Sequence, residues 1–199
     1  MAGRSGSARV PSGALALLAD AIGYALGACA QVTPGEMALP TPCAEWDLEA
    51  LLAHLAVSMA DLESAIRTGF LDLAPVAPAA EAPAAPDDPV EVLRDQAANL
   101  LVACYGHHGA GRLVLVGGLP LPRGIVACTG AVEIAVHGWD VSAARGRGEE
   151  IPAGLATRML ALYPLLVASR AGLFGPPVEV TPQASPGRRL VAYLGRDPG

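Results

Sequence analysis

The chain contains no lysine at all: its thirteen basic residues are arginines, and they are scattered along the 199 residues without a cluster. Nucleic-acid binding depends on a concentrated basic face, and the formal net charge here is -6, so we expect no nucleic-acid partner. No apolar run reaches the roughly 18 residues of a membrane-spanning helix. The arginine-containing N-terminus also lacks the apolar core of a signal peptide. We therefore expect a cytoplasmic protein with no membrane partner.

Aromatic residues are scarce, at 4% of the chain, whereas the hydrophobic fraction is high at 52%. This composition points to Ala, Leu and Val side chains packed between closely spaced helices. The four cysteines form no C-x-x-C pair, and cytoplasmic disulfides are rare, so we expect free and mostly buried thiols. They are Cys29, Cys43, Cys104 and Cys128.

Long segments with apolar residues at steps of three and four predict helices over 12–30, 47–68, from Pro89, over 122–144 and over 153–171. Asp47 and the pair Asp88-Pro89 are helix-start signals. A short helical piece ends at Leu194. Together these elements predict an all-α bundle. We expect residues 1–10 to be disordered and a single domain to span 11–199, with an exposed Ala/Pro-rich loop at 71–89.

Residues 112–116, Arg-Leu-Val-Leu-Val, have the composition of a short strand. Gly117, Gly118, Pro120 and Pro122 follow at once, and no partner strand is evident. We therefore predict an extended connection here rather than a sheet.

Chemistry concentrates in the stretch from Gly130 to Gly146. Glu133 and His137 are four residues apart, so on a helix both side chains lie on one face. His54 lies at the edge of the apolar stripe of the second helix, where it would face the bundle interior. Glu133 is the only ionisable group from Gly124 to Val136, and a carboxylate in such apolar surroundings requires a partner or a metal.

Two imidazoles and a carboxylate suit a divalent ion such as Zn²⁺ or Ni²⁺, and three protein ligands leave a position open for water or substrate. The site we predict is therefore His54, Glu133 and His137, with zinc as the expected metal and nickel as the alternative. A Glu-x-x-x-His pair is also common in salt bridges and on solvated helix faces that bind no metal. The spacing alone leaves this alternative open.

Four motifs in order resemble the DinB-like superfamily of metal-binding bundles, in particular the branch related to mycothiol-dependent maleylpyruvate isomerase. They are Thr41-Pro-Cys-Ala-Glu-Trp-Asp47, Leu51-Leu-Ala-His-Leu55, Glu133-Ile-Ala-Val-His-Gly-Trp-Asp140 and Leu194-Gly-Arg-Asp-Pro198. The resemblance implies an up-and-down four-helix bundle with an extra C-terminal helix. It also implies metal ligands at His54, Glu133 and His137, the residues reached above.

The same resemblance implies activation of a low-molecular-weight thiol, with mycothiol as a cosubstrate, for transfer to or isomerisation of a small organic electrophile. A zinc-bound thiol is deprotonated, which suits such chemistry. Maleylpyruvate isomerase carries a further C-terminal domain that we do not expect here, so its substrate is not carried over. Two alternatives stay open: a non-catalytic bundle that binds a small molecule, and a cyclase or isomerase of secondary metabolism. The sequence also leaves a homodimer open.

Residues near the predicted ligands have two interpretations each. Asp140 would orient an imidazole, or it is solvated while Trp139 packs between helices. Trp46 fits a packing anchor better than a substrate platform. Cys43 fits a small buried side chain, although a thiolate would be stabilised before a helix N-terminus. The remaining candidates are His107 and His108, expected in an exposed turn, and Arg123, which would meet an anionic substrate or water.

Overall fold

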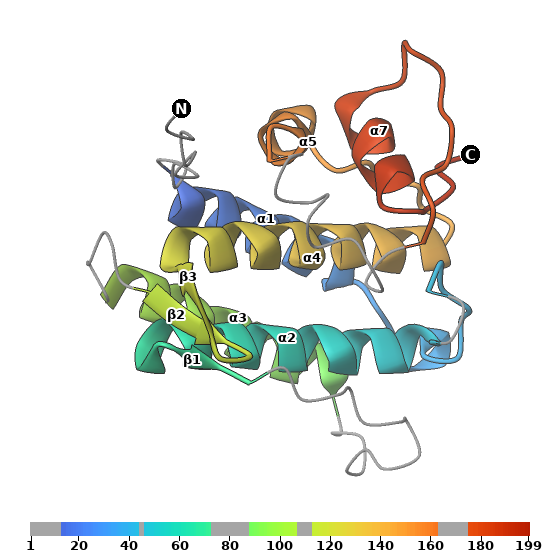
Figure 1. Cartoon of the computed structure of the whole chain (residues 1–199). Coiled ribbons are helices and arrows are strands. Elements are labelled where there is room, and N and C mark those ends of the chain that lie inside the picture. The colour runs from blue at the N-terminus through green and yellow to red at the C-terminus, as the bar shows by residue number, and fades with distance from the viewer. Residues whose placement is uncertain (1–12, 44–45, 73–87, 107–112, 163–174) are drawn as a thin grey trace, which may run out of the picture.

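The chain folds as a bundle of helices with one small sheet at its end (Figure 1). The computed structural model describes residues 13–43, 46–72, 88–106, 113–162 and 175–199. The predicted disordered segment 1–10, most of the loop 71–89 and the turn with His107 and His108 lie outside these residues. The helices are α1 (Ala14–Cys29), the 3-10 helix η1 (Pro34–Glu36), α2 (Leu48–Thr68), α3 (Pro89–Gly106), α4 (Arg123–Ala144), α5 (Ala153–Leu160) and α7 (Pro186–Tyr193).

The four long helices form two layers, α1 with α4 and α2 with α3 (Figure 1). α1 packs along α4, and α2 packs against both α3 and α4. A Cβ added to Gly138 of α4 would lie 2.9 Å from the Cα of Ala25, so glycine permits the close approach of α1 and α4. The shorter α5 and α7 pack on each other, on the side of the first layer away from α2 and α3. The predicted all-α bundle with an extra C-terminal helix is confirmed.

Local signals account for the helix ends that matter for the site. The Asp47 carboxylate accepts a 2.9 Å hydrogen bond from the backbone N–H of Ala50, which caps the start of α2 as predicted. Gly69 ends the same helix in the left-handed conformation, at φ 77. Asp88 accepts from the backbone N–H of Val90 at 2.9 Å and so caps α3. Within the described residues, no helix is both long and apolar enough to span a membrane.

The prediction of an unpaired connection at 112–116 is wrong. Leu113–Val116 is strand β2, which pairs antiparallel with β3 (Leu119–Pro122) and parallel with β1 (Phe70–Leu71). Gly117 and Gly118 both have positive φ, as a two-residue hairpin turn requires. The prolines of β3 are tolerated because β3 is an edge strand. The sheet therefore joins the end of α2 to the start of α4.

A buried arginine ties the far end of α4 to the chain between α1 and α2. The guanidinium of Arg145 donates to the backbone carbonyls of Ala28, in the last turn of α1, and of Gln31, just after that helix. It also donates to the Glu36 carboxylate, with 2.9 Å between Nε and Oε1. The Arg145 side chain is only 3% exposed. The segment that leads into α2 is thus anchored beside the half of α4 that carries His137.

Candidate metal centre

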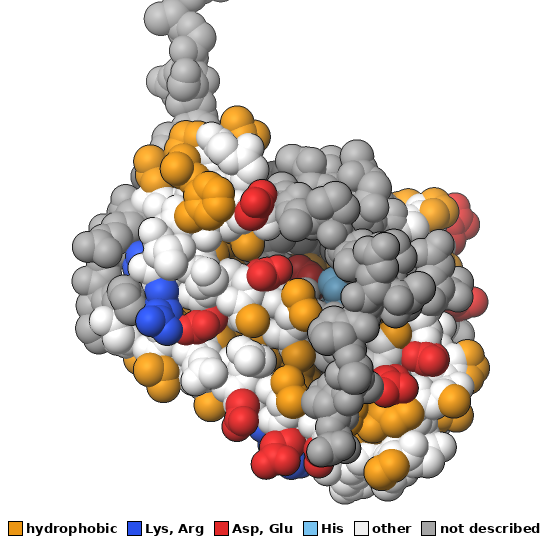
Figure 2. Space-filling view, turned by 90° about the horizontal axis from the view of Figure 1, so that it is seen from below, with side chains coloured by type: hydrophobic (Ala, Val, Ile, Leu, Met, Phe, Trp, Pro, Cys, Tyr) orange, Lys and Arg blue, Asp and Glu red, His pale blue; other side chains and the backbone are white. Residues whose placement is uncertain are grey.

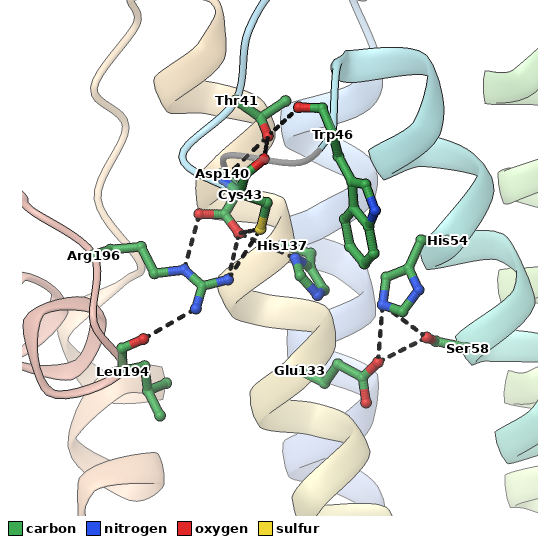
Figure 3. A network of polar contacts seen from close by, with 10 residues as sticks. All are labelled: Thr41, Cys43, Trp46, His54, Ser58, Glu133, His137, Asp140, Leu194 and Arg196. Carbon is green, nitrogen blue, oxygen red and sulfur yellow. Dashed lines mark hydrogen bonds and ion pairs between the residues drawn. The ribbon is translucent and has the colours of Figure 1, made fainter. Parts of the chain in front are cut away.

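The fold brings the three predicted ligands together between α2 and α4 (Figure 3). His54 comes from α2, and Glu133 and His137 come from successive turns of α4. One ligand atom from each residue lies within 4.8 Å of the others. The geometry expected from the i, i+4 spacing of Glu133 and His137 is therefore present, and the second helix supplies the third group.

The spacing between His54 and Glu133 suits a shared metal better than a direct hydrogen bond. Nε2 of His54 lies 3.4 Å from Oε1 of Glu133, beyond the usual 2.7–3.2 Å range of N–H···O hydrogen bonds. Nitrogen and oxygen ligands at about 2.0–2.1 Å from a tetrahedral zinc ion are separated by about 3.4 Å. The side chains of these two residues consequently fit the donor spacing of a zinc site.

Glu133 is less buried than its apolar sequence neighbours led us to expect, with 35% of its side chain exposed. The Ser58 hydroxyl donates a 2.7 Å hydrogen bond to its Oε1. Burial alone would raise the pKa of Glu133, but the neighbouring His54, the hydrogen bond from Ser58 and the nearby His137 together lower it. The carboxylate is thus held ionised at neutral pH, with its oxygens available to a cation.

One ring nitrogen of His137, Nδ1, is hydrogen-bonded to Asp140. Its Nδ1 lies 3.0 Å from Oδ2 of Asp140, which is completely buried. A carboxylate can only accept, so Nδ1 carries the proton and Nε2 is left with a lone pair for a metal. The structure favours the orienting role for Asp140 over a solvated position.

Arg196 completes this network from the C-terminal end of the chain (Figure 3). Its Nη2 lies 2.9 Å from Oδ2 of Asp140, and its Nε lies 3.2 Å from Oδ1, a two-point pairing. Burial would raise the pKa of Asp140, but hydrogen bonds from His137 and Arg196 and the arginine charge lower it. Arg196 lies in the Leu194-Gly-Arg-Asp-Pro198 motif, but no local pattern assigns it a role, because its partner is 56 residues away.

Trp46 lies against both imidazoles. Its ring centroid is 4.3 Å from that of His54 and 6.0 Å from that of His137, and the two imidazoles are 5.0 Å apart in an edge-on arrangement. The Thr41 hydroxyl donates to the carbonyl of Trp46 at 2.8 Å and so shapes the turn before α2. Trp46 is therefore a packing anchor, as predicted, and the surface it packs against is formed by the two histidine rings.

Cys43 does not have the environment of a stabilised thiolate. Its Sγ donates to Oδ2 of Asp140 at 3.4 Å and accepts from Nη2 of Arg196 at 3.3 Å. Burial, followed by the charge of Asp140, raises the pKa of the Cys43 thiol to about 12. Cys29, Cys104 and Cys128 are buried, and all four thiols are free, as predicted.

Trp139 and Arg123, two other candidate residues, contact other parts of the protein. Trp139 is 7% exposed and packs in the core. Arg123 is 8% exposed, and its Nη2 donates to the carbonyl of Ile66 at 3.0 Å. It therefore joins the start of α4 to the end of α2.

The half-open side of the site lies at a surface hollow. Figure 2 shows acidic side chains and an imidazole together on the face seen from below. Asp61 lies one turn beyond Ser58 on α2, and burial together with the charge of Glu133 raises its pKa. A depression of about 260 Å³ begins there, lined by Asp61, Ser64, Phe70, Leu71 and Asp72. Neither this depression nor a larger one of about 510 Å³ beside α7 is lined by any of the three predicted ligands.

Fold and site together define a helical-bundle protein with a candidate His-Glu-His metal centre. The chain belongs to the family described as the mycothiol maleylpyruvate isomerase N-terminal domain, which it matches over residues 18–142. This confirms the resemblance drawn from the four motifs. The matched segment contains His54, Glu133, His137 and Asp140, and it ends well before Arg196.

Similar proteins occur in Mycobacterium tuberculosis. Two uncharacterized proteins, from strains CDC 1551 / Oshkosh and ATCC 25618 / H37Rv, are each 27% identical to the chain over 177 residues. The alignment covers 84% of this chain and 88% of each relative. No solved structure matches the chain significantly. The relatives carry no assigned activity, so the chemistry is argued from the site.

Proposed function

We propose that this bundle holds a divalent metal, most simply zinc, on His54, Glu133 and His137, and presents its open position to a low-molecular-weight thiol or to water. The reaction partner is a small organic electrophile. The observation that carries the proposal is the 3.4 Å separation of His54 Nε2 and Glu133 Oε1, which suits two ligands of one metal. Membership of a mycothiol-related family supports the choice of a thiol.

The metal, when bound, would lower the pKa of a thiol or water and generate a nucleophile near neutral pH. Residues of the protein would bind the metal and orient its ligands. Ser58 fixes the Glu133 carboxylate, and Asp140 fixes the ring of His137. Trp46 packs against both imidazoles. The electrophile would approach from the exposed side of Glu133, whose side chain is 35% exposed.

Metal content tests the first half of this proposal. We expect about one zinc or nickel per chain by elemental mass spectrometry, and loss of the metal in the Glu133→Ala, His137→Ala double variant. His54→Ala should also lose the metal while keeping the helical circular dichroism. The matched control is Glu63→Ala, because Glu63 lies on α2 and pairs with the exposed Arg67. A wild-type protein that takes up no metal after reconstitution with zinc or nickel would refute the site.

Thiol binding tests the second half. In protein loaded with Co²⁺, addition of mycothiol should produce a thiolate-to-cobalt absorption band in the near ultraviolet. The band should be absent from the double variant. If loaded wild-type protein binds cobalt but mycothiol leaves its spectrum unchanged, the thiol assignment fails and water activation becomes the function to assay. If no metal binds, a ligand screen of the hollow would test the non-catalytic alternative.

A further inference from the structure

His137 is shared by two groups of potential metal ligands. One is the His54, Glu133 and His137 set described above. The other comprises Cys43, His137 and Asp140, whose ligand atoms also lie within 4.8 Å of one another. In the second set the Nδ1 of His137 faces Asp140, at 3.0 Å from its Oδ2, which leaves Nε2 for the first set. Thiolate, imidazole and carboxylate are all good zinc ligands, so the chain carries a competing site next to the proposed one.

A guanidinium group already occupies the cation position of this second set. Nη2 of Arg196 lies 2.9 Å from Oδ2 of Asp140 and 3.3 Å from Sγ of Cys43. It therefore contacts two of the three groups that a metal ion would use. A permanent positive charge at this point opposes a second cation, and the two-point pairing occupies the Asp140 oxygens.

Hydrogen bonds to backbone carbonyls and the conformation of the preceding glycine fix the position of Arg196. Its N–H donates to the carbonyl of Val191 in α7 at 3.0 Å, and its Nη1 donates to the carbonyl of Leu194 at 3.0 Å. The preceding Gly195 has φ 84 and a Cβ there would lie 2.8 Å from the backbone of Gly175. Glycine is needed for both the conformation and the contact. The turn after α7 thus directs a buried side chain, 9% exposed, into the network.

We propose that Arg196 is a positioning residue that decides which nitrogen of His137 is offered to metal. By filling the cation position beside Cys43 and Asp140, it keeps Asp140 as the acceptor of the Nδ1 proton. Nε2 is then presented to the His54 and Glu133 side. The inference rests on the proposed metal centre. It adds a selectivity element contributed by a part of the chain outside the segment that matches the family.

The test compares Arg196→Ala with wild type, using Co²⁺ and Zn²⁺ as probes without any added thiol. Wild-type protein should show cobalt absorption typical of nitrogen and oxygen ligands only. Arg196→Ala should show a thiolate-to-cobalt band, and the added Cys43→Ser change should remove it. Zinc affinity at the original site should fall about 10-fold to 100-fold, the usual effect of losing an outer partner of a metal ligand. Arg189→Ala, an exposed neighbour on α7, is the matched control.

Arg196→Lys keeps the charge and should restore the wild-type cobalt spectrum, which a purely structural role would not require. If Arg196→Ala does not fold, Arg196→Gln takes its place in the test. This variant keeps much of the side-chain volume without the charge, and it should show the thiolate-to-cobalt band. Wild-type affinity and no thiolate band in folded Arg196→Ala or Arg196→Gln would overturn the inference. So would a thiolate band in Arg196→Lys. A wild-type protein that binds no metal refutes the proposed centre instead, so the two failures are distinguishable.

Discussion

The Ser58 hydroxyl donates a 2.7 Å hydrogen bond to Oε1 of Glu133, the same oxygen that lies nearest to Nε2 of His54. Ser58 lies one helical turn after His54 on α2, so one helix supplies both a proposed ligand and the group that orients another.

Ser58→Ala should therefore weaken metal binding without abolishing it. All three proposed ligands remain, but the Glu133 carboxylate loses its donor, and such losses typically cost about 10-fold or more in metal affinity. Zinc affinity measured by competition with a chelator would show the change. Ser64→Ala, at an exposed position of the same helix, should bind zinc as wild type does. Equal affinity in Ser58→Ala would mean that Ser58 does not position Glu133.

Asp140→Asn should destabilise the metal-free protein strongly. Asp140 is completely buried and pairs with Arg196, and removing one partner of a buried ion pair typically costs about 3–5 kcal/mol. Urea unfolding followed by circular dichroism measures the loss. Asp20→Asn is the matched comparison because Asp20 pairs with Arg158 at the surface, where both side chains are about half exposed. That change should cost only about 0–1 kcal/mol. Similar effects for the two variants would contradict the assigned importance of the buried pair.

The ion pair of Glu36 and Arg145 predicts an acid-sensitive contribution to stability. The hydrogen bond from Arg145, with backbone and hydroxyl donation from Thr33, lowers the pKa of Glu36 from 4.5 to about 2. A folded-state pKa below the unfolded value means that the ionised carboxylate stabilises the fold above about pH 4.5. This contribution is lost as the pH falls towards 2.

Glu36→Gln should accordingly lower the melting temperature at pH 7, and the difference from wild type should shrink between pH 4.5 and 2. Thermal unfolding across this range provides the measurement. In an Arg145→Met background the pH-dependent effect of the further change of Glu36 should be smaller, because only the donation from Thr33 then lowers the pKa of Glu36. A constant difference at every pH would show that the contact contributes through packing and not through charge.

The cysteines should resist alkylation in the folded protein. Burial raises the pKa of Cys29 and Cys43 to about 12 and of Cys104 to about 11, and it also raises that of Cys128. Since the thiolate is the nucleophile, a rise from 9 to about 12 reduces the reactive fraction about 1000-fold near pH 8. Iodoacetamide labelling followed by mass spectrometry, with and without denaturant, tests this expectation. Rapid labelling of Cys43 in the native protein would contradict it.

The features that could be predicted from the sequence were the local ones. Helix starts at Asp47 and Asp88 follow from capping chemistry. Glu133 and His137 share a helix, so their common face follows from a four-residue spacing. Ser58 stands at the same spacing from His54 and could have been found by the same reasoning. Gly117 and Gly118 do not by themselves predict the hairpin, because adjacent glycines can end a strand as well as form a two-residue hairpin turn.

The features that escaped prediction depend on long-range contacts. No pattern near Arg196 indicates a partner 56 residues earlier in the chain. The sequence favoured a small buried side chain at Cys43, but it could not show which charge lies beside the thiol. The negative charge that opposes ionisation belongs to Asp140, which is 97 residues away. Only the fold brings these groups together.

The small sheet affects the geometry of the site, because both helices that carry the predicted ligands, α2 and α4, have one end at this sheet. α2 enters the sheet through Gly69, and α4 leaves it directly after β3. His54 lies 14 residues before Thr68, and His137 lies 14 residues after Arg123. At 1.5 Å per residue both imidazoles are about 21 Å from the sheet. Ser58 and Glu133 are each 10 residues from the same helix ends, about 15 Å along. The sheet thus fixes the ends of two antiparallel helices at the same level, so that Ser58 and Glu133 lie opposite each other. Inserting one turn into either helix between the sheet and these residues would separate Ser58 from Glu133.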